Sequence, residues 1–142
     1  MKSIIILALA LTFTTRSSLK AQTGVPDTLA YLQTIVQNKA QYIGQPFSKL
    51  MDSLQIQIKL FFPVAELPYD RFKETSTSFS FFFTATVDDL YLSYPMLEVI
   101  WQTPGDATQS RLLRKQFRSM GWNTVIATHY SARVIADIYI SD

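Results

Sequence analysis

Four cations gather on one side of a helix that the sequence predicts over residues 106–120. At 100° per residue their positions share one arc of about 100°, with apolar residues on the other side. The cations are Arg111, Arg114, Lys115 and Arg118, and the apolar residues are Leu112, Leu113, Phe117 and Met120. The helix contains no Glu to pair with these charges, so the face predicts binding to phosphate, lipid headgroups, acidic glycans or an acidic partner protein. The alternative is an ordinary solvated face that Asp70, Glu74 or Asp137 neutralises.

Aromatic residues form a second candidate surface. Phe81, Phe82 and Phe83 are consecutive, and on a strand such neighbours point to both faces. Phe82 together with Trp101 or Trp122 would then form a surface that binds sugars, a peptide or a hydrophobic partner. The alternative is that these rings pack in the core, where each buried Phe contributes about 1.5–3 kcal/mol to folding.

Catalytic chemistry has little support in the sequence. His129 and Ser131 are two residues apart on a predicted strand, where they would share a face with Asp137 of the next strand as base, nucleophile and orienting group. Ser131 lacks the glycines of a nucleophile elbow. One His and no Cys leave only carboxylates as metal ligands, and the four glycines are isolated, so no phosphate-binding loop is predicted. We predict no catalytic residue, no metal site and no cofactor, with a small periplasmic hydrolase centred on His129 as the alternative.

Two helices are predicted ahead of the strands. Apolar residues recur at helical spacing over 26–44 and again over 46–54. Asp27 is the expected N-cap of the first helix and Gly44 its stop, while Pro46 suits the first turn of the second helix.

Strands are predicted where apolar residues alternate with polar ones or where β-branched and aromatic residues cluster. The predicted strands cover 56–60, 77–87, 97–102, 123–129 and 134–140, with 91–94 as a candidate short strand. Pro63 ends the first strand, residues 64–75 are a loop, and Thr103-Pro104-Gly105 is a turn. Two strand faces are expected to be apolar: Phe79, Phe81 and Phe83 on one, and Val134, Ala136, Ile138 and Ile140 on the other.

The order of these elements is α-α-β-β-β-α-β-β. Strands in runs and helices in separate blocks predict an α+β domain with a largely antiparallel sheet and helices packed on one face. The uncharged stretch from Phe81 to Val87 is expected inside the sheet rather than at its edge.

The first residues have the pattern of a signal peptide. Lys2 precedes an apolar run from Ile4 to Phe13, and Ala21 is a small residue where a signal peptidase would cut. The run is about half the roughly 20 apolar residues of a membrane span. We predict a signal peptide over 1–21, a single domain over 22–142, and a periplasmic or secreted product.

Removal of this leader changes the charge of the chain. Of the 13 positive charges it takes Lys2, Arg16 and Lys20, so that ten remain against 11 negative ones. The formal charge therefore falls from +2 to −1. Without cysteine, the exported domain has neither disulfides nor a Cys zinc site to support it, so packing must stabilise it.

The segment Lys39–Lys59 carries a resemblance to known families. It contains Tyr42-Ile43-Gly44-Gln45-Pro46-Phe47-Ser48-Lys49-Leu50 and continues through Leu54 into Ile56-Gln57-Ile58-Lys59. This pattern resembles one that recurs in small exported proteins of Bacteroidota with no assigned activity. It also loosely resembles the helix-strand half of PASTA modules, in which a Gly precedes a short helix and a strand follows. That resemblance implies a role in binding peptidoglycan.

These features predict an exported, non-catalytic binding module of the cell envelope. Its expected partner is an acidic glycan or envelope polymer, or a protein, with no nucleic acid partner and no transmembrane segment. The predicted ligand-binding residues are Arg111, Arg114, Lys115 and Arg118, and the aromatic candidates are Phe82, Trp101 and Trp122.

Overall fold

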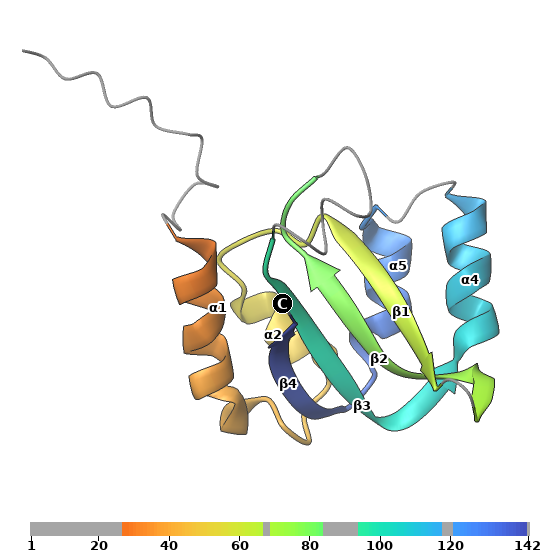
Figure 1. Cartoon of the computed structure of the whole chain (residues 1–142), viewed down its shortest axis with the longest axis horizontal. Coiled ribbons are helices and arrows are strands. Elements are labelled where there is room, and N and C mark those ends of the chain that lie inside the picture. The colour runs from red at the N-terminus through yellow and green to blue at the C-terminus, as the bar shows by residue number, and fades with distance from the viewer. Residues whose placement is uncertain (1–26, 67–68, 84–93, 118–120, 142) are drawn as a thin grey trace, which may run out of the picture.

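The computed structural model describes residues 27–66, 69–83, 94–117 and 121–141. These residues form an α+β domain with four α-helices, one 3-10 helix (η1) and a four-stranded antiparallel sheet in the order β1-β2-β3-β4 (Figure 1). The predicted fold class is thereby confirmed. The elements are α1 (Thr28–Gln37), η1 (Lys39–Gln41), α2 (Phe47–Ser53), β1 (Leu60–Glu66), β2 (Asp70–Ser80), β3 (Met96–Asp106), α4 (Ala107–Gln116), α5 (Thr124–Ser131) and β4 (Ile135–Ser141). Within the described residues no helix has the length and apolar character needed to cross a membrane.

Capping side chains set the first residues of α1 and α4. Asp27 Oδ1 accepts a hydrogen bond from the backbone N–H of Ala30 at 3.0 Å. Asp106 Oδ1 accepts one from the backbone N–H of Thr108 at 2.7 Å. Both bonds satisfy N–H groups that have no partner within the helix, so the predicted N-cap at Asp27 is confirmed, and Asp106 caps the helix that was predicted over 106–120.

The first predicted helix is too long. Asn38 donates to the carbonyl of Thr34 from its backbone N–H at 3.1 Å and from its side-chain amide at 2.8 Å. These bonds close α1 at Gln37, and η1 follows before the chain reaches Gly44. Gly44 has a φ of 74°, a left-handed conformation that suits glycine, and it leads the chain into α2.

The first hairpin lies later in the chain than the sequence pattern predicts. Ile56 and Ile58 are buried, as alternation requires, but strand pairing begins only at Leu60, opposite Ser80. β1 then runs through Pro63, which is tolerated because β1 is an edge strand of the described sheet. The predicted strand over 56–60 and the predicted loop over 64–75 are therefore both wrong.

β2 also ends earlier than predicted. It is an interior strand that stops at Ser80, while residues 84–87 and 91–93, which were predicted as strand, lie outside the described residues. Phe79 and Phe81 are fully buried, whereas Phe83 is 72% exposed. The three rings therefore do not share one apolar face, because the strand period ends before Phe81.

The predicted turn Thr103-Pro104-Gly105 lies inside β3. Ser76 of β2 pairs with Ile100, but Glu74 pairs with Gly105, so β3 carries extra residues between these two pairs. β3 therefore contains the turn-forming residues as an irregularity in its register and continues to Asp106.

The predicted strand over 123–129 is instead the helix α5. Asn123 Oδ1 accepts hydrogen bonds from the backbone N–H groups of Val125 at 2.9 Å and Ile126 at 3.1 Å, so Asn123 is an effective N-cap. Ile126 and Tyr130 lie four residues apart on one side of the helix, and both are fully buried. The order of the elements is therefore α-α-β-β-β-α-α-β, not the predicted order.

β4 is a strand, as predicted, but its apolar face is not regular. Ile100 pairs with Asp137 and Trp101 pairs with Ile135, which leaves Ala136 as an extra residue. This bulge lets Ile135 and Ile138, three residues apart, both reach full burial. The bulge interrupts the regular alternation that was predicted for Val134, Ala136, Ile138 and Ile140.

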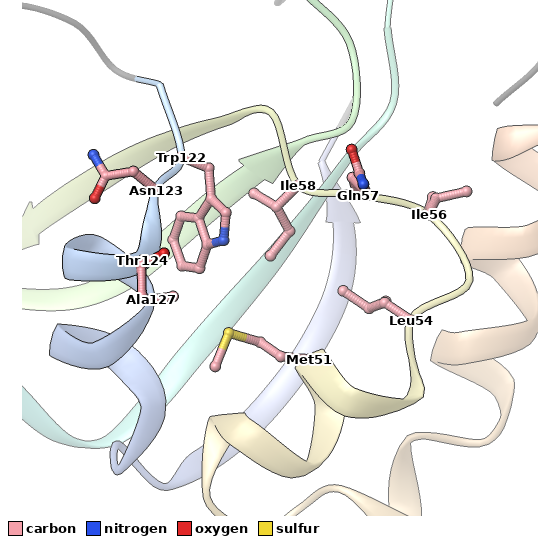
Figure 2. Close-up of a pocket in the computed structure, with 9 residues that line it drawn as sticks. All are labelled: Met51, Leu54, Ile56, Gln57, Ile58, Trp122, Asn123, Thr124 and Ala127. Atoms are coloured by element: carbon pink, nitrogen blue, oxygen red, sulfur yellow. The ribbon is translucent and has the colours of Figure 1, made fainter.

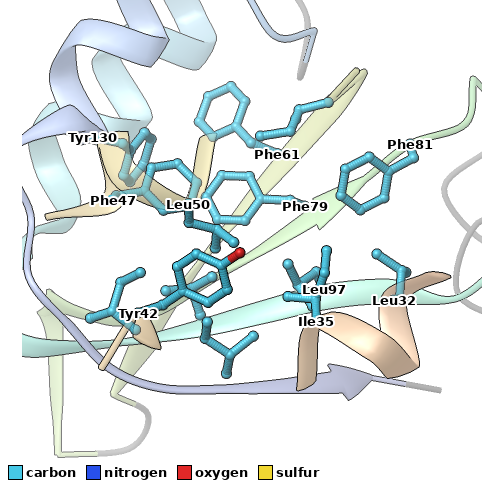
Figure 3. Packing of buried hydrophobic residues seen from close by; sticks show 14 of the residues in the cluster. Leu32, Ile35, Tyr42, Phe47, Leu50, Phe61, Phe79, Phe81, Leu97 and Tyr130 are labelled. Carbon is cyan, nitrogen blue, oxygen red and sulfur yellow. The ribbon is translucent and has the colours of Figure 1, made fainter. Parts of the chain in front are cut away.

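The core contains rings from both helices and sheet (Figure 3). Phe47 of α2 stacks on Phe79 of β2 with ring centroids 4.8 Å apart, and Trp101 meets Phe47 edge-on at 5.4 Å. Each α-helix contributes side chains to this cluster or packs against it, including Leu32, Ile35, Leu50, Leu113, Ile126 and Tyr130. On the opposite face of the sheet Phe62 and Met96 form a small separate cluster.

Candidate functional site

The first candidate site joins α4 to the end of the β1–β2 hairpin, which lies beside the first turns of the helix (Figure 1). Arg111 Nη2 donates to the backbone carbonyl of Arg71 at 2.8 Å, and Arg111 Nε donates to the carbonyl of Ala107 at 3.1 Å. The Arg71 guanidinium lies 5.0 Å from the ring centroid of Phe72, and that of Arg111 lies 5.9 Å from it. Two cations from distant parts of the chain therefore lie around one aromatic ring.

This surface exposes apolar as well as cationic groups. We define the cationic–aromatic surface by Tyr69, Arg71, Phe72, Lys73, Arg111, Leu112, Arg114 and Lys115. Tyr69 is 86% exposed, Phe72 54% and Leu112 53%. The exposure of Leu112 corrects the prediction that it lies on the buried side of the helix, while Leu113 and Phe117 do pack against the core. Arg118 and Met120 lie outside the described residues.

The carboxylates that were expected to neutralise the helix have other partners. Glu74 pairs with Arg133 at 2.8 Å, Asp137 with Lys39 at 2.5 Å, and Asp70 with Lys73 at 3.5 Å. Among the side chains that the structure describes, Arg111, Arg114 and Lys115 form no ion pair with a carboxylate. Arg111 donates instead to the backbone carbonyls of Ala107 and Arg71.

Among the described acidic residues, Asp106 is nearest to α4 in the sequence. The backbone N–H of Thr108 lowers the pKa of Asp106 most, because its hydrogen bond favours the carboxylate, and the charge of Arg111 lowers it further. Asp106 is therefore ionised at neutral pH and acts mainly as the N-cap of α4.

Of the predicted aromatic surface, Trp101 is buried, and Phe82 and Trp122 are half-buried. Trp101 is only 3% exposed, and its Nε1 donates to Thr77 Oγ1 at 2.9 Å inside the core. Phe82 is half-buried and stacks on Tyr94 with centroids 4.7 Å apart. Trp122 is half-buried and meets Phe79 edge-on at 5.4 Å. The exposed aromatic residue beside the cations Arg71 and Arg111 is Phe72, and Tyr69 is exposed three residues before it. Both lie in the predicted loop over 64–75, where no site residue was predicted.

Trp122 lines a hollow with a volume of about 500 Å³. It lies between α2 and α5, and the indole ring projects into the space between Met51 and Ile58 (Figure 2). Gln57, Asn123 and Thr124 supply the polar part of its wall. Since Asn123 Oδ1 already caps α5, the hollow is suited chiefly to an apolar group.

The second candidate site is a cluster of polar side chains around the fully buried Glu74. Glu74 Oε1 accepts hydrogen bonds from Thr77 Oγ1 at 2.5 Å and from Arg133 Nη1 at 2.8 Å. Glu74 Oε2 accepts a hydrogen bond from Ser110 Oγ, and Tyr130 Oη donates to the same Ser110 oxygen at 3.2 Å. Burial raises the pKa of the Tyr130 hydroxyl, and the nearby charge of Glu74 raises it further.

Arg133 is held in place on several sides. Its guanidinium lies 4.3 Å from the ring centroid of Trp101 and 5.3 Å from that of Tyr130. Its Nη2 donates to the backbone carbonyl of Glu74 at 3.2 Å. A Cβ at Gly105 would lie 2.5 Å from this Nη2. The absence of a side chain at Gly105 is therefore what lets Arg133 reach Glu74.

His129 joins this cluster to another hollow, about 400 Å³ in volume, which it lines with Arg133 and Asp106. His129 Nε2 lies 3.4 Å from Ser110 Oγ. Desolvation by burial is the main cause that lowers the pKa of His129; the charge of Arg133 lowers it further, while those of Glu74 and Asp106 oppose the change. The ring is therefore neutral at pH 7.

The predicted set of His129, Ser131 and Asp137 is not assembled. Ser131 Oγ donates to the carbonyl of Thr128 at 2.8 Å, and Asp137 pairs with Lys39. The prediction is wrong because His129 and Ser131 lie on the helix α5 and not on a strand. Residues two apart on a helix point in different directions. The hydroxyl near His129 belongs instead to Ser110, which is fully buried and donates to Glu74.

Within the described residues no group of three or more His, Cys, Asp and Glu side chains is placed to hold a metal ion. Comparison of the chain with protein-family models, curated proteins and solved structures gives no match.

Proposed function

We propose that the chain is an exported, non-catalytic binding domain of the cell envelope that binds an acidic polymer through the cationic side of α4. The observation that carries this proposal is that Arg111, Arg114 and Lys115 have no carboxylate partner among the described side chains, while Glu74 pairs with Arg133, Asp137 with Lys39 and Asp70 with Lys73. The leader pattern that ends near Ala21 supports export.

The fold supports this location for the site. We infer that the helices cover one face of the sheet, because all four contribute to or pack against the cluster that contains Phe61, Phe79 and Val99. α4 packs through Leu113 and Phe117 and buries Ala107 and Ser110, so Arg111 and Lys115 are exposed, while Arg114, four residues after Ser110, is half-buried. Exposed charges separated from a ligand by more than about 8 Å are screened at physiological salt, so binding is expected to be direct and salt-sensitive.

Retention on immobilised heparin, an acidic polysaccharide, tests the proposal. Lys115→Glu and Lys49→Glu form a matched pair, because both residues are exposed helical lysines and each substitution changes the net charge equally. Lys115→Glu should elute at lower salt than the wild type, and the triple variant Arg111→Glu/Arg114→Glu/Lys115→Glu at lower salt still. Lys49→Glu should elute with the wild type. Equal shifts for the two single variants would show that only net charge matters and would overturn the proposal.

The alternative function, a hydrolase centred on His129, has one supporting contact. His129 lines a hollow and lies 3.4 Å from the hydroxyl of Ser110. A nucleophile must reach its substrate, however, and Ser110 is fully buried with its hydroxyl hydrogen directed at Glu74. Binding through α4 is therefore the better-supported function.

A further inference from the structure

We propose that Tyr69, Arg71 and Phe72 at the end of the hairpin complete the site on α4, and that its ligand is a polysaccharide of acidic sugars. This inference rests on the proposed function and specifies its ligand. The cations would hold the carboxylates, and the exposed rings would pack against the sugar rings.

The hydrogen bond from Arg111 to Arg71 makes one site of the two elements. It joins residues 40 positions apart, and a second bond to Ala107 holds the same guanidinium at the helix surface. A guanidinium has five N–H donors, so two bonds fix its position and leave capacity for a carboxylate. Arg71, on the hairpin side, lies over the ring of Phe72. Carboxylates along one polysaccharide would thus contact cations on both α4 and the hairpin.

The exposed rings favour sugars over a simple polyanion. Charge alone would be served by Arg71, Arg111, Arg114 and Lys115 without any aromatic residue. Phe72 instead presents a ring that is 54% exposed beside the guanidinium groups of Arg71 and Arg111, and Tyr69, three residues before it, is 86% exposed. An aromatic ring packs against the apolar face of a sugar ring, a contact that a linear polyphosphate cannot make.

The same surface is less suited to a lipid bilayer. An interfacial helix buries a broad apolar side about 5–10 Å into the membrane. On α4 the apolar residues Leu113 and Phe117 pack against the protein core, and the exposed side carries Leu112 among Thr108, Gln109, Lys115 and Gln116. Leu112, even together with the exposed Tyr69 and Phe72 of the hairpin, gives less apolar surface than the broad apolar side of an interfacial helix.

Three probes and two variants test this inference. The probes are alginate, which is a polymer of uronic acids, inorganic polyphosphate, which has charge but no sugar, and phosphatidylglycerol vesicles. Phe72→Leu removes the ring and keeps an apolar side chain. Phe83→Leu is the matched control, because Phe83 is also exposed and also lies beneath a cation, Lys59 at 5.5 Å, but is not part of the surface. Thermal unfolding verifies that each variant is folded.

Phe72→Leu should raise the Kd for alginate about three- to tenfold and leave the Kd for polyphosphate unchanged. Phe83→Leu should change neither. Equal losses for both probes, an unchanged Kd for alginate, or equal effects of the two variants would overturn the role of the ring while the binding function stands. Binding to vesicles but not to alginate would overturn the sugar assignment in favour of a membrane. Failure of wild type to bind either soluble polyanion would instead overturn the proposed function.

Discussion

Glu74 and Arg133 form an ion pair at 2.8 Å in which the carboxylate is fully buried and the guanidinium side chain is only 14% exposed. A buried pair of this kind is costly to break, because the remaining charge has no water to solvate it. Ser110 and Thr77 satisfy the other hydrogen-bonding capacity of Glu74, so the cluster is complete only when Arg133 is present.

Arg133→Met should therefore lower the free energy of unfolding by about 3–5 kcal/mol. The double variant Glu74→Gln/Arg133→Met should recover part of that loss, since it removes the unpaired charge. Urea unfolding of wild type, both single variants and the double variant measures the coupling. Additive effects of the two substitutions would contradict a direct energetic link between Glu74 and Arg133.

Gly105→Ala should destabilise the protein through Arg133 rather than through the backbone. The added Cβ would lie 2.5 Å from Arg133 Nη2, so the guanidinium must move away from Glu74. The expected loss is about 1–3 kcal/mol. In an Arg133→Ala background the same substitution should be nearly neutral, because the clashing side chain is absent. An equal loss in both backgrounds would place its cause elsewhere.

Local sequence patterns were sufficient to predict much of the fold. Asp27 and Asp106 mark helix starts because capping depends on neighbouring residues, and the apolar spacing of α2 depends on its own seven residues. α5 was missed because Val125 and Ile126 are β-branched and favour strands. The N-cap at Asn123 and the burial of Ile126 with Tyr130 stabilise the helix. That burial depends on the packing of the whole domain and could not be read from the local sequence.

The candidate sites were less predictable because they join distant residues. Arg111, Arg114 and Lys115 were identified from helical spacing, but the contact of Arg111 with Arg71 spans 40 positions. The bonds of Glu74 to Ser110 and Arg133 span 36 and 59 positions. No local period relates such residues, so only the sheet register and the docking of α4 bring them together.

The full chain, expressed in a bacterium with an outer membrane, should lose residues 1–21. The apolar run from Ile4 to Phe13 would engage the export machinery, and cleavage after Ala21 would leave Gln22 as the first residue. Intact-mass measurement and N-terminal sequencing of the periplasmic fraction detect this product. Leu7→Arg/Leu9→Arg interrupts the apolar run and should leave the chain uncleaved in the cytoplasm. Recovery of the intact 142-residue chain from the periplasm would contradict cleavage.

The stability of the domain should fall below about pH 6.5 because of His129. Burial lowers the pKa of His129 in the folded state, so over the interval between its unfolded and folded pKa the unfolded chain binds a proton that the folded chain does not. The free energy of unfolding therefore decreases as the pH falls through this interval and levels off, for this group, below the folded pKa. Asp106 and Asp137, whose pKa values are also lowered, add their losses only at more acidic pH. Urea unfolding at pH 7.5 and 5.5 should show a smaller difference for His129→Gln than for wild type, and an equal difference would assign the effect to other groups.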